Sequence, residues 1–513
     1  MSGSEVLSGR CWPGVPEQIA CWSSATPDAP AVVQGERTWS YRQLADSVGA
    51  LTTELERAGL GAGQVVAVTG PRDFRLVAAW VAVLARRCVL FPVDPALPLA
   101  FRQQVLGRAG AAVVLALDDM SAAGYPAVPC LRVPRGGLPD GAGRGVRMSP
   151  PGAEEPGYVF FTSGSTGVPK AVLGRHRSLA HFLSWMRSAL AVGPGDRMPH
   201  LASPGFDVSL REVFLPLVSG ATLCLPPPGS LPPARVLPWL QANRVTLLPV
   251  VPTVARAWLH ATRETVRLEG LRTVLFSGEP LNNTLVERLR AQLDYRGAVI
   301  NLYGPTETTL VRCWHTVTHP VPGIQPLGRA IPGSQVWVEQ APGAPAPVGE
   351  VGEIVLRTVY GTSGYLGATP SEAARFSFGP GGEVVYRTGD LGRMDAGGLL
   401  HFLGRTDDQV KIYGVRLHLR AVEAVLEAQV GIDQAAVTAE QGRDGDPPRL
   451  TARLVLAPGR AEVPRGLRRA LLDHLPAAAV PAHLIAVSAL PQTATSGKLD
   501  RSRLANKPFP PSS

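Results

Sequence analysis

Short apolar runs alternate along the chain with segments in which apolar residues recur at helical spacing. Strand-like runs lie at 245–250, 274–276 and 298–302, and a helical pattern at 281–293 separates the last two. Strands that alternate with helices are typical of layered α/β folds, in which helices cover the faces of a sheet. The pattern therefore predicts an α/β protein.

Glycine- and proline-rich stretches interrupt this pattern at 133–157, 226–233 and 341–349. Each stretch is typical of a surface loop within a domain. The chain has 513 residues, of which 45% are hydrophobic, and this exceeds what a single core usually holds. We expect at least two domains.

The most informative segment is 158–172, which reads YVFFTSGSTGVPKAV. An apolar, strand-like run enters a loop rich in glycine and hydroxyl groups. Glycine lets backbone N–H groups approach an anion closely, hydroxyl groups add donors, and a lysine adds positive charge. The spacing matches neither the G-x-x-x-x-G-K-[ST] loop nor the G-x-G-x-x-G dinucleotide turn. We interpret the segment as a phosphate-binding loop with the donors Thr162, Ser163, Gly164, Ser165, Thr166, Gly167 and Lys170.

The formal net charge is +9, from 50 lysines and arginines against 41 aspartates and glutamates. The basic residues are scattered, without a long run or interleaved aromatic residues, so we expect no nucleic-acid partner. A generally basic surface would suit an anionic nucleotide and an acidic protein partner.

The six cysteines show no C-x-x-C spacing, and a chain of this size needs no disulfide staples, so we expect reduced thiols. The first ten residues carry no apolar signal region, and no run of 18 apolar residues follows. These features predict a cytoplasmic protein without a membrane partner.

The chain resembles the adenylate-forming (ANL) enzymes, which include acyl-CoA synthetases, luciferases and the adenylation domains of nonribosomal peptide synthetases. The TSGSTGVPK loop is similar to their signature loop, and further family motifs follow the family's order over nearly the whole length. These motifs are WSYRQL (39–44), LFPVDPALP (90–98), FDVS (206–209), NLYGPTETT (301–309), GEIVLR (352–357), YRTGDL (386–391), GRTDDQVKIYG (404–414) and LPQTATSGKLDR (490–501).

The resemblance implies a large N-terminal domain of layered sheets and helices over 1–404. A small, mobile α+β C-terminal domain over 405–513 would follow, with a hinge at Asp407. After adenylate formation, family members rotate this domain to present another face to the thiol acceptor. Relatives commonly read KIRGxRIELGEIE where this chain has KIYGVRLHLRAVE. The resemblance therefore supports the adenylation half-reaction more firmly than the geometry of the later transfer of the acyl group to the thiol.

The resemblance also implies an ATP site with Mg²⁺. The 162–170 loop would hold the β- and γ-phosphates, with Thr162 and Lys170 as catalytic residues, and Glu307 would ligate Mg²⁺. Lys498 looks like the catalytic lysine that bridges the substrate carboxylate, the α-phosphate and the ribose ring oxygen. The remaining nucleotide contacts would come from Gly278 and Glu279 at the adenine edge, Asn301, Tyr303 stacked on adenine, Gly304, Thr306 beside the metal, Asp390 on the ribose hydroxyls and Arg405.

The segment 206–211 bears on the choice of acid. Acyl-CoA synthetases and luciferases usually have histidine where this chain has Phe206, and they lack the adjacent Asp207, which in amino-acid-activating relatives binds the substrate ammonium. The alternative is that Asp207 caps a helix. Motif alignment adds the mostly apolar substrate positions Val208, Arg211, Pro249, Leu275, Ser277, Leu302, Leu310 and Val311.

Two interpretations of Arg211 are open, because a guanidinium is costly to bury without a partner. Its side chain turns outward toward Glu212 or a backbone carbonyl, which leaves room for a small or medium apolar amino acid, or it points inward and pairs with a substrate carboxylate or polar group. We favour the first. Ser277 is also compatible with the amino group of a β-amino acid.

The sequence thus predicts an ATP-dependent ligase that activates an amino acid and passes it to the phosphopantetheine thiol of a separate carrier protein in natural-product biosynthesis. No HHxxxDG condensation motif is present and only ANKPFPPSS follows the last motif, so we expect a free-standing enzyme. An MbtH-like protein is a further partner compatible with the family. The alternatives are an acyl- or aryl-CoA ligase and an adenylation enzyme for an acidic amino acid.

Overall fold

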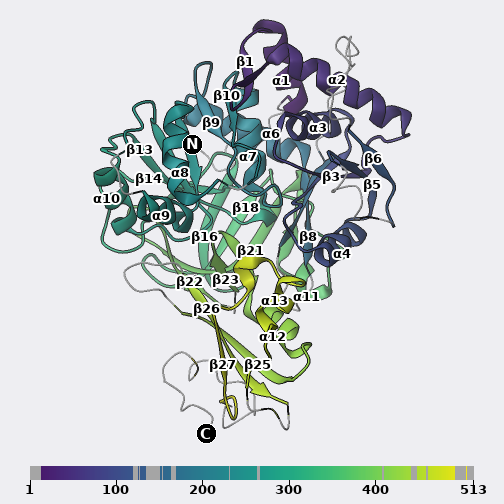
Figure 1. Cartoon of the computed structure of the whole chain (residues 1–513). Helices are drawn as coiled ribbons and strands as arrows, with labels where there is room; N and C mark the ends of the chain where they lie inside the picture. The colour runs from purple at the N-terminus through teal and green to yellow at the C-terminus, as the bar shows by residue number, and fades with distance from the viewer. Residues whose placement is uncertain are drawn as a thin grey trace. The chain divides into compact units, whose positions relative to one another are not determined.

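The structure is a computed structural model (Figure 1). It describes residues 13–118, 125, 127–133, 151–152, 154–162, 169–229, 231–262, 266–406, 409–440, 448–457, 460, 462–491 and 504. The chain forms two compact units. The first comprises Met1–Pro95, Val105–Phe161 and Ala171–Thr406, and the second comprises Ala96–Gln104, Thr162–Lys170 and Asp407–Ser513. The functional division into 1–404 and 405–513 stays a prediction.

Several sheets flanked by helices make up the described chain, so the α/β class is confirmed. The helices of the N-terminal part are α1 (Val15–Ala25), α2 (Tyr41–Arg57), α3 (Phe74–Ala85), α4 (Leu99–Ala109) and α6 (His176–Ala189). Helix α2 begins at a capping box, in which Ser40 and Gln43 satisfy each other's backbone N–H groups. Helix α3 begins where Asp73 accepts the N–H groups of Arg75 and Leu76.

A seven-stranded sheet has the order β19-β8-β7-β4-β3-β5-β6, and β3 pairs in parallel with both β4 and β5. Strand β4 is buried along its whole length, as expected for a parallel strand covered on both faces. The strands are β3 (Val65–Thr69), β4 (Val89–Val93), β5 (Ala111–Ala116), β6 (Cys130–Arg132), β7 (Pro156–Thr162), β8 (Lys170–Arg175) and β19 (Tyr365–Leu366).

A four-stranded sheet has the order β2-β1-β10-β9, with β1 parallel to β10 and antiparallel to β2. Its strands are β1 (Pro30–Gln34), β2 (Arg37–Ser40), β9 (Arg197–Pro199) and β10 (Thr222–Leu225).

The predicted strands at 245–250, 274–276 and 298–302 are confirmed as neighbours in a five-stranded sheet of order β11-β12-β13-β14-β15. Strands β11, β12 and β13 run parallel, and the predicted helix 281–293 is the crossover helix α10. Helices α8, α9 and α10 gather beside β13 and β14 in Figure 1. The elements are β11 (Leu247–Val250), β12 (Thr273–Ser277), β13 (Ala298–Tyr303), β14 (Cys313–Thr316), β15 (Arg329–Ala330), α7 (Val208–Val218), α8 (Pro233–Ala242), α9 (Pro252–Ala261), α10 (Asn283–Gln292) and the 3₁₀ turn η1 (Thr306–Thr308).

The two faces of this sheet belong to different cores. Leu275 and Leu302 pack in a cluster with Leu210, Val213 and Phe214 of α7. On the other face, side chains of β11, β12 and β13 pack with α8, α9 and α10. Alternate residues of a strand point to opposite faces, so each strand contributes to both clusters.

An antiparallel six-stranded sheet has the order β17-β16-β18-β21-β20, and β22 pairs with β21. Its elements are β16 (Ser334–Ala341), β17 (Ala344–Pro345), β18 (Gly352–Thr358), α11 (Pro370–Ala373), β20 (Phe376–Phe378), the 3₁₀ turn η2 (Pro380–Gly382), β21 (Val384–Met394) and β22 (Leu400–Arg405).

The second unit has its own hydrophobic core, which includes Val422, Leu426, Val437 and Leu454. It contains a hairpin, a three-stranded sheet and short helices. They are β23 (Gln409–Ile412), β24 (Val415–His418), α12 (Leu419–Glu427), β25 (Ile432–Glu440), β26 (Arg449–Leu456), α13 (Leu467–Leu472), the 3₁₀ turn η4 (Ala477–Ala479) and β27 (His483–Ala486).

Within the described residues, no helix has both the length and the apolar character needed to cross a membrane. The five cysteines that the structure describes, Cys21, Cys88, Cys130, Cys224 and Cys313, are free thiols.

Candidate functional site

Asp207 stands at the N-cap position of α7, but its side chain makes no capping hydrogen bond to the helix. Its backbone is already helical, with φ −59° and ψ −28°, whereas capping residues usually have extended backbone. The adjacent Phe206 and Val208 are half-buried, as is Asp207 itself. The alternative interpretation of Asp207 as a helix cap is therefore wrong.

Four predicted substrate positions share one face of the parallel sheet. Pro249 of β11 is in register with Leu275 of β12, and Ser277, two residues further along β12, is in register with Leu302 of β13. Register partners and residues two apart lie on the same face of a sheet. Leu310 and Val311, from the segment that follows η1, are buried in the same hydrophobic cluster as Leu275 and Leu302. The structure thus brings these positions together.

Arg211 joins α7 to this face. Its side chain is 1% exposed, and its Nη2 donates a hydrogen bond of 3.2 Å to Oγ of Ser277. Glu212, the expected outward partner, instead accepts the backbone N–H groups of Leu201 and Ala202 at 2.8 Å and lies 3.1 Å from Nδ1 of His200. The favoured interpretation, in which Arg211 turns toward Glu212 or a backbone carbonyl, is therefore wrong. The guanidinium points to another substrate position.

The segment after β13 folds back tightly at Gly304. A Cβ atom built at this residue would lie 2.2 Å from the carbonyl oxygen of Leu310. Thr309 and Leu310 have positive φ of 70° and 60°, which is unusual for residues with side chains. Only glycine permits this close approach, and the strained pair turns Leu310 and Val311 into the core.

Glu307 is 1% exposed and lies in this folded-back segment. Its Oε1 accepts a hydrogen bond of 2.7 Å from the Tyr365 hydroxyl, and its carbonyl oxygen accepts one of 2.6 Å from Thr362. Thr306, the predicted companion, is the first residue of the same 3₁₀ turn. The structure therefore holds the predicted metal-ligating carboxylate in a fixed place inside the fold.

Two residues that the sequence did not predict hold the same segment. Arg312 is fully buried, and its guanidinium donates to the carbonyl oxygens of Thr308 and Tyr360. The Tyr158 hydroxyl donates to Oγ1 of Thr309 at 3.0 Å. The partners of Arg312 lie 4 and 48 residues away, and that of Tyr158 lies 151 residues away, so no local spacing signals the longer contacts.

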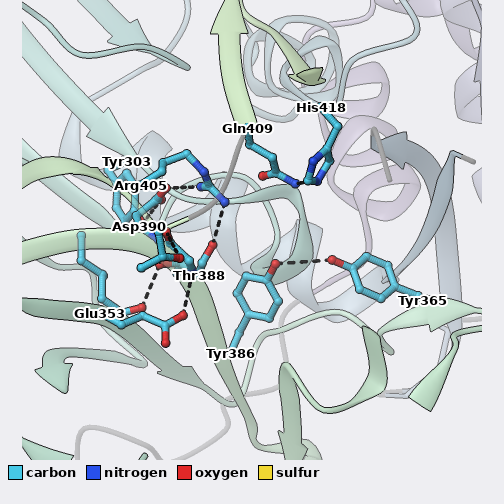
Figure 2. A network of polar contacts seen from close by, with 12 residues as sticks. Tyr303, Glu353, Tyr365, Tyr386, Thr388, Asp390, Arg405, Gln409 and His418 are labelled. Carbon is cyan, nitrogen blue, oxygen red and sulfur yellow. Dashed lines mark hydrogen bonds and ion pairs between the residues drawn. The ribbon is translucent and has the colours of Figure 1, made fainter. Parts of the chain in front are cut away.

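Asp390 of β21 receives partners on both carboxylate oxygens (Figure 2). The Tyr303 hydroxyl donates to Oδ2 at 2.6 Å, and Arg405 of β22 forms an ion pair with Oδ1. Burial, and then the neighbouring Asp390 charge, raise the pKa of Tyr303 well above its usual value, so its hydroxyl stays a donor. Each carboxylate oxygen has two lone pairs and can accept a second hydrogen bond. Asp390 can thus still accept two further hydrogen bonds, as the predicted ribose contact requires.

Thr388 and Glu353 support the β21 backbone at this point. The backbone N–H of Asp390 donates to Oγ1 of Thr388 at 3.0 Å, and that of Gly389 donates to Glu353 at 2.8 Å (Figure 2). Sequence spacing did not identify either side chain as part of the site.

The predicted adenine-edge residues follow the carboxyl ends of the parallel strands or lie close to them. Gly278, with φ 90°, and Glu279 follow β12, and Glu279 accepts the backbone N–H of Thr253 at 3.0 Å. Asn301 is buried and its amide donates to the carbonyl of Pro326 at 2.8 Å. In parallel sheets, ligands bind beyond the carboxyl ends of the strands, where these residues lie.

Part of the predicted machinery falls outside the described residues, namely Ser163, Gly164, Ser165, Thr166, Gly167, Asp407 and Lys498. Thr162 and Lys170, which flank the loop, are described and are each 9% exposed. Among the described residues the Thr162 hydroxyl has no hydrogen-bond partner.

The donor set fits Mg²⁺ bound together with a nucleotide. The described residues contain no cluster of three or more His, Cys, Asp or Glu side chains that could enclose a metal ion. Mg²⁺ is usually held by one or two carboxylates plus substrate phosphates rather than by such a cage. Glu307 supplies a buried carboxylate of this kind, and Thr306 an adjacent hydroxyl.

Comparison with known proteins identifies the class. The model of the AMP-binding enzyme family matches residues 20–366, well over half of the chain. The chain therefore belongs to the AMP-binding enzymes, and its identification as an adenylate-forming enzyme is confirmed.

Among the relatives that the chain resembles are nonribosomal peptide synthetases. The chain is 35% identical to the probable non-canonical nonribosomal peptide synthetase CymA of Salinispora arenicola, over 98% of this chain and 6% of CymA. It is 36% identical to the phosphinothricin tripeptide synthetase PhsC of Streptomyces viridochromogenes, over 93% of this chain and 44% of PhsC. The chain thus spans less than half the length of these relatives.

The fold is that of a solved structure of PA1221, a nonribosomal peptide synthetase protein containing adenylation and PCP domains. The TM-score is 0.81 at 27% identity, over 98% of each chain.

Proposed function

We propose that this protein activates an amino acid as its aminoacyl adenylate, with ATP as the second substrate, and then transfers it to a carrier-protein thiol. The observation that carries the amino-acid assignment is Asp207, whose carboxylate does not cap α7 and follows an aromatic residue at the start of that helix. A substrate ammonium removed from water requires such a counter-ion.

In the first step a carboxylate oxygen of the amino acid attacks the α-phosphorus of ATP, and the bond to the bridging oxygen breaks, which releases pyrophosphate. Asp207 holds the ammonium, and Asp390 holds the ribose hydroxyls with Arg405 beside it. Tyr303 presents its ring to adenine. Together these contacts orient the two anionic reactants, which is the main requirement of phosphoryl-group chemistry.

Bound Mg²⁺ would neutralise charge on the phosphates and the departing pyrophosphate. Glu307, kept in place by Tyr365, would hold it with Thr306. By resemblance, Lys170 and the 162–170 loop add positive charge and N–H donors around the β- and γ-phosphates. Lys498 would stabilise the charge that develops at the α-phosphate.

In the second step the thiol sulfur of a phosphopantetheine arm attacks the acyl carbon, the thiol proton is lost and AMP leaves. A PCP domain accompanies the adenylation domain in the related PA1221. We infer a carrier protein as acceptor here, with an MbtH-like protein as an optional partner. An acyl- or aryl-CoA ligase would instead use CoA, so a direct comparison of the two acceptors distinguishes the alternatives.

The test of amino-acid recognition is Asp207→Ala. We expect the loss of amino-acid-dependent pyrophosphate exchange by at least about 100-fold, because the ammonium loses its counter-ion, while ATP still binds. Asp28→Ala, at an exposed aspartate, is the matched control. Normal activation of the native substrate by the Asp207 variant would refute the ammonium assignment.

Lys498→Ala tests the catalytic lysine separately. This variant should lose adenylate formation but still transfer the acyl group from a supplied aminoacyl adenylate. Unchanged pyrophosphate exchange would remove Lys498 from the mechanism.

A further inference from the structure

Arg211 is a buried cation whose hydrogen-bonding capacity is largely unused. Among the described residues its Nε and Nη1 atoms have no hydrogen-bond partner, and only Nη2 donates, to Ser277. Burial lowers the pKa of Arg211 from its usual value, but a guanidinium remains charged at neutral pH. A buried charge with unpaired donors is strongly unfavourable unless a ligand completes it.

No neighbouring carboxylate in the described part of the chain completes it. Glu212 and Asp207 both act electrostatically on Arg211, but neither forms a hydrogen bond or an ion pair with it. Glu212 is committed to His200 and to two backbone N–H groups. On the sheet face around Ser277, Leu275 and Leu302 are apolar and offer no side-chain acceptor. The described residues thus leave the guanidinium without an acceptor for its Nε and Nη1 donors, and a bound ligand can supply one.

We propose that the activated amino acid carries a second carboxylate, in its side chain, which binds Arg211 and Ser277. This inference rests on the proposed function and replaces the apolar substrate expected from sequence. A guanidinium offers several N–H groups in a planar fork that matches a carboxylate, and Ser277, which accepts from Arg211, keeps its own O–H as a further donor.

The spacing of the charges on α7 agrees with such a substrate. Asp207 and Arg211 are four residues apart, so they lie on one side of the helix with a rise of about 6 Å. Because both side chains leave the same side of α7, one amino acid with an acidic side chain can place its ammonium at Asp207 and its second carboxylate at Arg211. The guanidinium beside Ser277 also repels an ammonium at this place, which argues against a β-amino group bound at Ser277.

The experiment is pyrophosphate exchange by the full chain with amino acids matched in shape but not in charge. The pairs are aspartate with asparagine and glutamate with glutamine. Valine, leucine and alanine are the apolar members, and one acyl acid and one aryl acid complete the panel. We expect one acidic amino acid to exceed its amide by on the order of 100-fold in kcat/KM, because the amide leaves the guanidinium without a counter-ion. Affinities for the free amino acids, measured by thermal shift in the absence of ATP, should rank the acid above its amide as well.

Arg211→Leu should reverse this selectivity, with the acidic amino acid losing at least about 100-fold and the amide or an apolar amino acid gaining. Leucine also removes the buried charge, so the fold should be retained. Arg235→Leu, at an exposed position of α8, controls for loss of one positive charge and should keep the wild-type pattern.

Failure of this inference is distinguishable from failure of the proposed function. If apolar amino acids respond and acidic ones do not, the carboxylate subsite is refuted, while amino-acid activation stands. If no amino acid responds and acyl or aryl acids do, both are refuted. The wild-type panel decides these outcomes even if Arg211→Leu does not fold.

Discussion

At the scale of single residues, Gly304 decides whether the segment that carries Glu307 can fold back on β13. The added Cβ of Gly304→Ala would meet the backbone of Leu310, which cannot move aside as a flexible side chain could. We expect the variant to lower the free energy of unfolding by roughly 1–3 kcal/mol, and to raise the KM for ATP and the amino acid together. Urea unfolding and steady-state kinetics measure the two effects.

Gly107→Ala is the matched control, because a Cβ at Gly107 meets no atom within 4 Å. This residue lies inside α4, where alanine is favoured over glycine. The free energy of unfolding of the Gly107→Ala variant should therefore equal or exceed that of the wild type. Equal stability of the Gly304 variant and the wild type would contradict the role given to this close approach.

Sequence spacing identified Asp207 but not the direction of Arg211. The FDVS motif is local, so the place of Asp207 at the start of a helix could be anticipated. The orientation of Arg211 depends on Ser277, 66 residues away on β12. It also depends on Glu212, which is already bound to His200 and to two backbone N–H groups. Such contacts follow from packing and not from spacing.

At the scale of elements, Arg312 ties the segment after η1 to the residues that follow β18. Arg312→Met should leave the carbonyl oxygens of Thr308 and Tyr360 without these donors, at a cost of roughly 1–3 kcal/mol for each buried acceptor. We expect lower stability and weaker binding of both substrates, measured by urea unfolding and by titration. Arg296→Met, at a side chain that is 91% exposed, should change neither quantity. Unaltered binding in a folded Arg312 variant would show that the clamp is dispensable.

Helix α6 carries two buried histidines that make stability depend on pH. Burial lowers the pKa of His176 to about 4 and that of His181 to about 3. Between pH 6.5 and 4 the unfolded chain therefore binds more protons than the folded chain, so stability falls as the pH is lowered through this window. Each histidine contributes a slope of at most about 1.4 kcal/mol per pH unit.

His181→Phe should make this slope shallower and preserve the stacked contact with Tyr360, whose ring centroid lies 3.6 Å away. Urea unfolding from pH 7.5 to 4.5 measures the slope. His260→Gln, at an exposed position of α9, should leave it unchanged. Parallel curves for the wild type and His181→Phe would contradict the assignment.

The elements that could be predicted best were those with a strong apolar pattern. Strands β11, β12 and β13 and helix α10 appear where expected, with ends shifted by a few residues. The order of strands within each sheet could not be predicted in the same way, because β19 pairs with β8 across nearly 200 residues. That long-range pairing puts Tyr365 next to Glu307, which explains why sequence reasoning missed Tyr365.

At the scale of the whole molecule, and under the proposed function, the net charge of +9 predicts how the carrier protein would be recognised. If an acidic carrier is attracted by a basic surface, salt should weaken that encounter, since screening shortens the reach of charge to about 10 Å at 0.1 M. Raising NaCl from about 50 to 500 mM should increase the KM for the carrier several-fold and leave pyrophosphate exchange nearly constant. An equal effect of salt on both reactions would argue against electrostatic recognition of the carrier.

The residues assigned to substrate choice, from Phe206 to Val311, all lie within one continuous stretch of the chain, which contains α7, β11, β12 and β13. Asp390 and Arg405 come later, from β21 and β22. Under the proposed function, a single genetic exchange that replaces this stretch would transfer selectivity as a unit and leave the ribose contacts of the recipient in place. The positions that share one sheet face thus also lie in one segment of the gene, so they can be inherited together.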